Sequence, residues 1–311
     1  MAWGIYKPIL NSNKNTVYVI AGPTAVGKTA IAIQLAQKLG TSVISADSRQ
    51  CYREMTIGTA KPSPEELAAV PHYFINSHSV TEHLSTADYE KLALKYLEEI
   101  FQHTNTAVVC GGTGLYIKSL CEGIDPMPDV DEDIEAGVNE QYKTEGITWL
   151  QQAVEKEDPE FFAVGEVQNP VRLIRALTFM RSTGKSIVHY RTGAKTERPF
   201  NIVKIALELP REELYHRINK RVDIMMEEGL LEEVKSLYEL RHLKNLQTVG
   251  YSELFDFIDG KCTLEEAIDK IKQHSRNYAK RQLTWFRKDK EFVWMDAGRK
   301  DIANDIVTTK K

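Results

Sequence analysis

The strongest constraint on the fold of this chain lies near its N-terminus. TVYVIAGP (16–23) is a short apolar, β-branched run that ends at Gly-Pro, which is typical of a buried strand. KTAIAIQLAQKLG (28–40) follows with apolar residues at helical spacing, and Gly40 stands where a glycine often ends a helix. The residues between these two segments complete the phosphate-loop pattern G-x-x-x-x-G-K-[ST]. Its four fixed positions are Gly22, Gly27, Lys28 and Thr29.

This loop has the chemistry of an anion site. Its backbone N–H groups and the start of the following helix are expected to surround phosphate oxygens. Lys28 would add a point charge, and the Thr29 hydroxyl would ligate Mg²⁺, which makes magnesium the expected cofactor. The pattern is a nucleotide-binding, ATP-binding-like motif, but by itself it indicates only phosphate with magnesium.

The rest of the chain alternates strand and helix patterns around one interruption. Further strands are predicted at 41–48, 106–114 and 201–209, and a helix at Thr86–Gln102. After Pro210 the chain is expected to be helical nearly to Lys288. This alternation predicts an α/β fold, in which a parallel sheet that begins with a phosphate loop is flanked by helices.

The interruption is predicted to be an inserted helical domain at 121–200, between two parts of a catalytic core at 1–120 and 201–311. Within it, VRLIRALTFMRSTGKS (171–186) reads as an amphipathic helix. One face is predicted to carry Val171, Ile174, Leu177 and Met180. The remaining surface would carry Arg172, Arg175 and Arg181.

Charge is unevenly distributed along the chain. The formal net charge is −4, which argues weakly against a nucleic-acid partner. However, residues 167–196 and 270–288 contain no acid and several Lys or Arg residues each. Such tracts are what local contacts with RNA phosphates need. The alternative is that both tracts are solvated helix faces balanced by acids nearby in space.

Composition favours a globular enzyme of the cytoplasm. The hydrophobic fraction is 42% and the charged fraction 27%, which is ordinary for such proteins. No apolar run is long enough for a transmembrane helix, and the N-terminus lacks the apolar core of a signal peptide. The four cysteines form no C-x-x-C pair, so reduced thiols are expected.

Three further features point to a site at the carboxyl edge of the predicted sheet. Asp47 follows the second strand, where it would bind magnesium, contact a nucleotide, act as a general base, or merely cap a turn. GGTGLY (111–116) follows the third strand, and Cys110 stands where many nucleotide hydrolases carry an Asp. Arg217 and Arg221 are four residues apart, so they either clamp phosphates or pair with nearby acids.

Six segments together resemble one family, the tRNA dimethylallyltransferases, also called tRNA isopentenyltransferases. They are GPTAVGKT (22–29), SADSRQCYREMTIGTAKP (45–62), GGTGLY (111–116), RLIRAL (172–177), TVGYSEL (248–254) and AKRQLTWFR (279–287). The segments occur in order and span most of the chain. The chain is similar to the bacterial type, because no Cys/His set follows AKRQLTWFR as in the zinc fingers of many eukaryotic relatives.

The resemblance implies a reaction and a set of residues. A dimethylallyl group would pass from its diphosphate to N6 of the adenosine 3′ of the anticodon in tRNA (position 37), and diphosphate would leave. By motif, Asp47 is the expected general base, and Lys28, Thr29 and Arg221 hold the diphosphate directly or through Mg²⁺, with Thr24 beside the reacting centre. The expected diphosphate contacts are Gly22, Pro23, Thr24, Ala25, Val26, Gly27, Lys28 and Thr29.

The same resemblance implies how tRNA is held. The matching segments for tRNA contact are Asp47, Ser48, Arg49, Gln50, Thr113, Val171, Arg172, Leu173, Ile174, Arg175, Gln247, Thr248, Val249, Gly250, Tyr251 and Ser252. The inserted domain is expected to grip the anticodon stem-loop, in a monomeric protein without membrane contact. One departure is EVQNP (166–170), where many relatives carry His-Pro-Asn-Asp or similar.

Two other enzyme classes remain compatible with the phosphate loop. The first is a small-molecule kinase, and the second is a prenyltransferase that acts on free adenine nucleotides. A basic inserted domain favours tRNA over a free nucleotide, since a free nucleotide needs no such surface. A non-catalytic RNA-binding protein would not need the phosphate loop.

Overall fold

A computed structural model describes residues 14–308. Within this range, parallel strands form a six-stranded sheet in the order β3-β2-β4-β1-β5-β6. The strands are β1 (Thr16–Ala21), β2 (Val43–Ser45), β3 (His72–Tyr73), β4 (Thr106–Gly111), β5 (Asn201–Glu208) and β6 (Val293–Asp296). The predicted α/β class and the four predicted strands are confirmed. The strands β3 and β6 were not predicted; β3 has only two residues, and β6 is a four-residue strand that follows the long helical segment.

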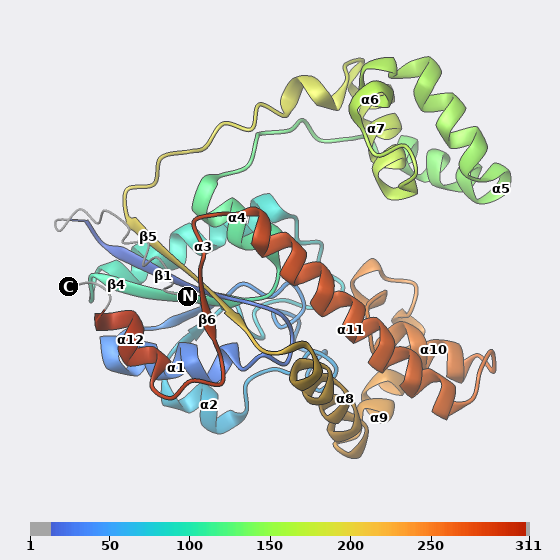
Figure 1. Cartoon of the computed structure of the whole chain (residues 1–311). Helices are drawn as coiled ribbons and strands as arrows, with labels where there is room; N and C mark the ends of the chain where they lie inside the picture. The colour runs from blue at the N-terminus through green and yellow to red at the C-terminus, as the bar shows by residue number, and fades with distance from the viewer. Residues whose placement is uncertain (1–13, 309–311) are drawn as a thin grey trace. The chain divides into compact units, whose positions relative to one another are not determined.

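Helices cover both faces of this sheet (Figure 1). The helices of the same part of the chain as the sheet are α1 (Lys28–Leu39), α2 (Pro64–Ala69), α3 (Thr86–Phe101), α4 (Gly114–Glu122), α8 (Arg211–Glu227), α9 (Leu230–Ser236), α10 (Tyr251–Ile258), α11 (Leu264–Lys288) and α12 (Ile302–Thr308). Two 3₁₀ turns, η2 (Tyr238–Leu240) and η3 (Lys244–Leu246), lie before α10. No helix within residues 14–308 has the length and apolar character needed to cross a bilayer.

Successive side chains of the central strand β1 point to opposite faces of the sheet, and each set packs against different helices. Val17 and Val19 of β1 pack in one apolar cluster with α3 and α4, whereas Tyr18 and Ile20 pack in another with α1 and α12. The register pairs Ala21, the last residue of β1, with Gly111 at the end of β4 and with Ala206 near the end of β5. The carboxyl ends of these three parallel strands therefore lie at one edge.

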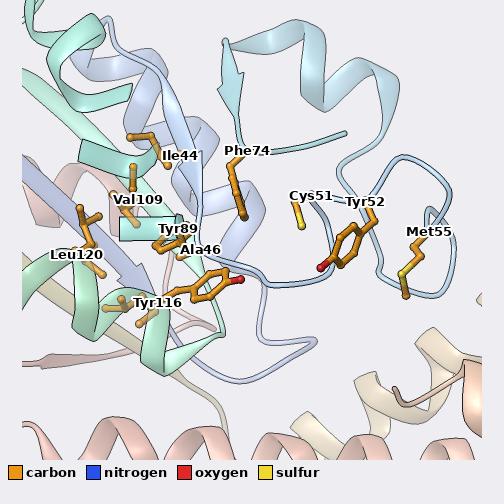
Figure 2. Close-up of a cluster of buried hydrophobic side chains, with 14 of the residues drawn as sticks. Ile44, Ala46, Cys51, Tyr52, Met55, Phe74, Tyr89, Val109, Tyr116 and Leu120 are labelled. Carbon is orange, nitrogen blue, oxygen red and sulfur yellow. The ribbon is translucent and has the colours of Figure 1, made fainter. Parts of the chain in front are cut away.

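The segment that follows β2 is anchored by buried side chains (Figure 2). Cys51, Tyr52 and Met55 are all buried and belong to the same cluster as Phe74. Next to them, the rings of Tyr89 and Tyr116 stack with centroids 4.0 Å apart. This packing fixes the chain directly after Asp47, although it has little regular secondary structure.

Residues 123–196 form a second compact unit, with residues up to 122 and from 197 forming the first. Its helices are α5 (Glu132–Glu157), α6 (Pro159–Val164), α7 (Pro170–Thr183) and the 3₁₀ turn η1 (Ile187–Tyr190). The unit lies inside the predicted insertion 121–200. Cys121 and Phe200, at the two ends of that prediction, are instead buried in the core of the first unit.

The buried face of α7 agrees only in part with the predicted one: Leu177 is buried and Ile174 packs against the same core, as predicted, but Val171 does not. Val171 is 73% exposed, whereas Leu173, Ala176 and Leu177 are buried in the core of the second unit. Val171 follows Pro170 in the first turn of the helix, so helical spacing alone does not place it against a neighbour. The arginines of α7 remain on its exposed or half-buried surface, as predicted.

Candidate active site

The predicted site residues of the first unit gather at the carboxyl edge of the sheet. β1 leads into the phosphate loop, β2 into Asp47, β4 into Gly112 and Thr113, and β5 into α8, which carries Arg221. This is the edge at which parallel α/β sheets bind ligands. Two neighbouring cavities, of about 790 Å³ and 400 Å³, open there.

The phosphate loop has the backbone that its glycines require. Gly22 has φ of +147°, and a Cβ atom there would lie 2.8 Å from the carbonyl oxygen of Leu207. Gly27, the residue before α1, has φ of 101°. Because L-residues rarely adopt such angles, glycine is needed at both positions. The buried side chain of Val26 anchors the loop to the core beneath it.

Lys28 lies in the smaller cavity with the loop. Its Nζ donates a 2.7 Å hydrogen bond to the carbonyl oxygen of Pro23. Burial, the largest cause, and the positive charge of Arg221 together lower the pKa of Lys28 to about 8, while the charge of Asp47 opposes the shift. Thr29 lines the same cavity.

Arg221 approaches the loop from α8. Its Nη1 donates to Oγ1 of Thr24 at 3.3 Å, and burial lowers its pKa despite the opposing charge of Asp47. Arg217, four residues earlier, donates instead to Glu213 at 2.6 Å on the exposed surface. Each arginine therefore follows a different one of the two alternatives. Arg221 lies in the site, where it could clamp phosphates, and Arg217 pairs with an acid at the surface.

Asp47 both caps a turn and faces the site. Its Oδ1 accepts hydrogen bonds from the backbone N–H groups of Arg49 (2.8 Å) and Gln50 (3.3 Å). No described residue hydrogen-bonds to Oδ2. Asp47 lines both cavities, so one carboxylate oxygen holds the turn while the other is available for chemistry.

The glycine turn after β4 holds the chain around Asp47. The backbone N–H of Ser48 donates to Oγ1 of Thr113 at 3.0 Å, and the N–H of Thr113 donates to the carbonyl oxygen of Ala46 at 3.1 Å. A Cβ at Gly111 would collide with Ala46, so glycine permits this close approach. Tyr278 is hydrogen-bonded to Thr113, and burial raises the pKa of Tyr278 to about 12.

The structure adds a brace that sequence reasoning did not single out. Gln282 of α11 is buried; its Oε1 accepts the backbone N–H of Thr24 at 2.8 Å, and its Nε2 donates to the carbonyl oxygen of Gly112 at 2.9 Å. A Cβ at Gly112 would collide with this amide. Gln282 thus joins the phosphate loop to the glycine turn. Its only sequence signal was its place in AKRQLTWFR.

The larger cavity collects residues expected to contact tRNA. Those that line it are Asp47, Ser48, Arg49, Gln247, Thr248, Val249, Gly250 and Ser252. Gln50 lines the smaller cavity instead, and its amide donates to the carbonyl oxygens of Thr59 and Ala60. The two cavities share Thr24, Asp47 and Arg221, so these residues stand where the contents of both would meet.

Two side chains expected to contact tRNA, those of Tyr251 and Leu173, are buried. Tyr251 is 0% exposed, and its hydroxyl donates to Glu233. Leu173 is 0% exposed in the core of the second unit. Neither side chain is accessible to RNA, because each fills the interior of its own unit. The segments that carry them position their neighbours instead.

The remaining predicted tRNA contacts lie in the second unit. Arg172 and Arg175 of α7 both repel Arg191, whose pKa is lowered first by burial and then by these two charges. Arg172 also pairs with Glu166. The arginines therefore form a local basic cluster, which we call the arginine cluster (Arg172, Arg175 and Arg191).

The four cysteines are free thiols, and Cys110 is the one that stands where many nucleotide hydrolases carry an Asp. Cys51, Cys110, Cys121 and Cys262 are all free, as predicted. Cys110 lies in the smaller cavity, and burial raises its pKa to about 12, so it stays neutral.

A cluster of carboxylates lies outside the two cavities. Its members, Glu122, Asp289 and Glu291, surround the buried ammonium of Lys204 at 3.2, 2.7 and 2.7 Å.

Comparison with known proteins identifies relatives along nearly the whole chain. The model of the family described as IPP transferase matches residues 50–289. The tRNA dimethylallyltransferase 1 of Phocaeicola vulgatus is 47% identical over 90% of this chain and 93% of its own length. The tRNA dimethylallyltransferase of Cytophaga hutchinsonii is 46% identical over 91% of this chain and 93% of its own.

Solved structures agree with these sequence relatives. The tRNA isopentenylpyrophosphate transferase of Bacillus halodurans aligns with a TM-score of 0.71 at 39% identity, covering 96% of this chain and 97% of that one. A eukaryotic dimethylallyltransferase acting on tRNA aligns with a TM-score of 0.75 at 26% identity, over 96% and 81% of the two chains. This chain therefore belongs to the IPP transferase family, the tRNA dimethylallyltransferases.

Proposed function

We propose that this chain transfers a dimethylallyl group from dimethylallyl diphosphate to N6 of the adenosine 3′ of the anticodon in tRNA. The observation that carries the proposal is the meeting of the two cavities at Thr24, Asp47 and Arg221. One cavity has the phosphate loop expected for a diphosphate. The other has the polar lining expected for a nucleotide. The family to which the chain belongs supports the same reaction.

The smaller cavity suits a leaving diphosphate. Backbone N–H groups of the loop, the ammonium of Lys28 and the guanidinium of Arg221 all supply positive charge there. The N–H of Thr24 is already bonded to Gln282, so Thr24 would contribute its hydroxyl, which Arg221 orients. As the bond from the allylic carbon to oxygen breaks, negative charge grows on diphosphate, and these cations stabilise it.

Magnesium fits the residues of this cavity. Mg²⁺ prefers oxygen ligands, and the Thr29 hydroxyl lies there, with the carboxylate of Glu66 also in the lining. Thr29 would hold the ion together with diphosphate oxygens. The ion would supply further neutralisation of the leaving group.

Asp47 is suited to take the proton from the adenine amine. Its Oδ1 is used by the turn, and its Oδ2 is not bonded to any described residue. The adenine nitrogen would form a bond to the allylic carbon while diphosphate leaves with the electron pair of the broken carbon–oxygen bond. One N6 proton would pass to Asp47, which balances the charge.

The adenosine must leave its stack to reach this edge of the sheet, as in other base-modifying enzymes. The larger cavity offers it polar groups from two segments, with Tyr278 beside them; they belong to Asp47, Ser48, Arg49, Gln247, Thr248 and Ser252. The arginine cluster of the second unit would contact phosphates of the anticodon stem-loop.

The test is incubation with dimethylallyl diphosphate, Mg²⁺ and an unmodified tRNA that carries adenosine at the target position. Digestion and mass spectrometry of the RNA should detect N6-dimethylallyladenosine. Parallel reactions replace tRNA by AMP, and the donor by ATP. Product on AMP but not on tRNA would overturn the proposed acceptor, and phosphoryl transfer without prenyl transfer would indicate a kinase.

A further inference from the structure

The chain segment Thr56–Lys61 is a wall shared by both cavities. Gly58, Thr59 and Ala60 line the larger cavity, while Ile57, Thr59, Ala60 and Lys61 line the smaller one. The segment is irregular, and Ala60 has a positive φ of 47°. Its position must therefore be set by contacts from other parts of the first unit.

One carboxylate from outside both cavities hydrogen-bonds to the backbone of the first three residues of this wall. Glu233 of α9 accepts backbone N–H groups from three consecutive residues: Thr56 (2.9 Å), Ile57 (2.8 Å) and Gly58 (3.0 Å). Hydrogen bonds to a charged acceptor are among the strongest in proteins. Glu233 itself lines neither cavity. Its contacts are thus with the wall and not with the contents of the site.

Tyr251 completes this contact from the buried side. Its hydroxyl donates to Oε1 of Glu233 at 2.5 Å, and burial followed by the charge of Glu233 raises the pKa of Tyr251 well above its usual range. A Cβ on Gly58 would lie 2.5 Å from the Tyr251 ring. The wall therefore rests directly on this ring, with no room for a larger residue at position 58.

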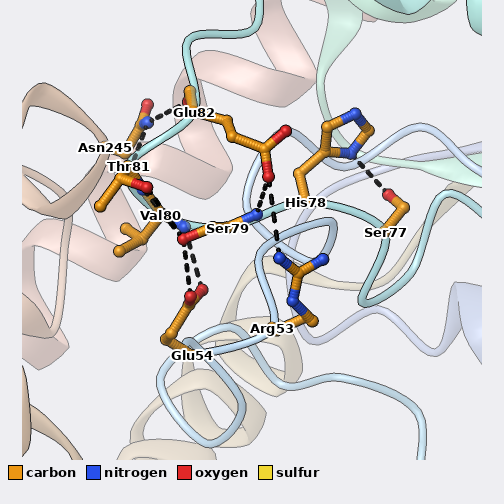
Figure 3. A network of polar contacts seen from close by, with 9 residues as sticks. All are labelled: Arg53, Glu54, Ser77, His78, Ser79, Val80, Thr81, Glu82 and Asn245. Atoms are coloured by element: carbon orange, nitrogen blue, oxygen red, sulfur yellow. Dashed lines mark hydrogen bonds and ion pairs between the residues drawn. The ribbon is translucent and has the colours of Figure 1, made fainter.

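Other contacts fix the neighbouring chain. Gln50 holds the far end of the wall through the carbonyl oxygens of Thr59 and Ala60. Before the wall, Glu54 accepts the hydroxyl of Ser79 (2.8 Å) and the N–H of Val80 (2.9 Å), as Figure 3 shows. Asn245 in turn donates to the carbonyl oxygen of Val80. Among residues 14–308, only Glu233 accepts hydrogen bonds from the N–H groups of residues 56–58.

We infer that Glu233 is a positioning residue for the transfer reaction, acting through the wall Thr56–Lys61. The inference rests on the proposed function. By fixing three consecutive amides, the carboxylate sets where Thr59 and Ala60 stand between donor and acceptor. Misplacing reacting groups by about 1 Å can cost about 10²-fold in rate, so a distant contact of this kind bears on catalysis.

The variant Glu233→Gln tests this role. One oxygen remains as an acceptor, but the amide NH₂ faces N–H groups that need an acceptor. We expect kcat/KM of the folded protein to fall by about 10²-fold. Both constants should contribute, because kcat should fall and KM for dimethylallyl diphosphate should rise. Glu233→Asp keeps the charge on a shorter side chain and should restore part of the rate.

The matched control is Glu232→Gln, the adjacent residue of α9. Its side chain is 70% exposed and, within the described part of the chain, pairs only with Lys235, at 3.4 Å. We expect wild-type kinetics from it. Gly58→Ala should displace the wall, because the added Cβ would collide with the Tyr251 ring. We expect the same kinetic changes as in Glu233→Gln, although Glu233 itself is unaltered.

The outcomes separate this inference from the proposed function. If the wild-type protein transfers no prenyl group to tRNA, the proposed function fails. If the wild type is active and Glu233→Gln only lowers the melting temperature, with kcat and KM unchanged for the folded fraction, the inference is overturned. Faster hydrogen exchange at the amides of residues 56–58, measured by mass spectrometry, should accompany the kinetic loss.

Discussion

The carboxyl edge of the sheet and the α7 surface of the second unit hold polar residues in different ways. At the edge, polar side chains bond to backbone groups far away in the sequence, as Gln282 does with the N–H of Thr24 and the carbonyl oxygen of Gly112. On α7, Arg175 has no ion pair among residues 14–308, and Arg172 pairs only with the exposed Glu166. Both regions contain residues expected to bind substrate.

This difference predicts a division of roles. A braced residue has a fixed position, which is what stabilisation of a transition state requires. An exposed arginine that is free to move can follow a phosphate backbone but cannot fix a reacting atom. Changes at the edge should therefore lower kcat, whereas changes on α7 should weaken tRNA binding and leave kcat unaltered.

The largest expected effect is that of Asp47→Asn. The asparagine keeps an oxygen for the N–H groups of Arg49 and Gln50, so the turn should persist. It cannot take a proton, and loss of a general base lowers kcat by about 10²–10⁴-fold. Single-turnover rates and tRNA binding should be measured on the same preparation. Parallel losses of binding and rate would mean that Asp47 serves only the turn.

Arg221→Ala should have the next largest effect. Its guanidinium bonds to Thr24 and lines the smaller cavity, the proposed diphosphate site. Removing one such charge-stabilising group costs about 10²–10³-fold in kcat. Arg217→Ala is the matched control on the same helix, because Arg217 contacts Glu213 at the surface. Equal losses from the two variants would contradict the assignment of Arg221 to the site.

Local patterns in the sequence predicted the elements that carry this edge. The run before Gly22 is β1, and the helix after it ends at Gly40, which has φ of 60° as expected for a helix-ending glycine. The predicted helix Thr86–Gln102 is α3, Thr86–Phe101. These features depend on neighbouring residues, which is why periodicity and glycine positions reveal them.

Long-range contacts could not be predicted in this way. Gln282 bonds to a residue 258 positions away, and Glu233 captures the N–H of Thr56 across 177 positions. No spacing rule links such residues. Likewise, the alternatives for Arg217 and Arg221 stayed open until α8 was placed beside the phosphate loop. The exposure of Val171 depends on where α5 packs against α7. The sequence of α7 does not specify that position.

A smaller effect should follow from the pKa of Lys28. In the proposed reaction Lys28 would bind phosphate oxygens as an ammonium, which is the form present below its pKa of about 8. Raising the pH above 8 therefore removes charge from the donor site and should raise KM for dimethylallyl diphosphate, by about fivefold between pH 8 and pH 9. Initial rates across this range test it. The change should disappear in Lys28→Met, whose KM is high at every pH.

The smallest effect is expected on α7, and it tests the division of roles most directly. Arg175→Ala should weaken tRNA binding severalfold and reduce the salt dependence of binding by about one phosphate contact, without changing kcat at saturating tRNA. Arg181→Ala is the control on the same helix, because Arg181 already pairs with Glu157 at 2.7 Å. Filter binding at several salt concentrations measures both. A fall in kcat for Arg175→Ala would mean that this surface also fixes the adenosine for reaction, and the contrast between a catalytic edge and a binding surface would then be wrong.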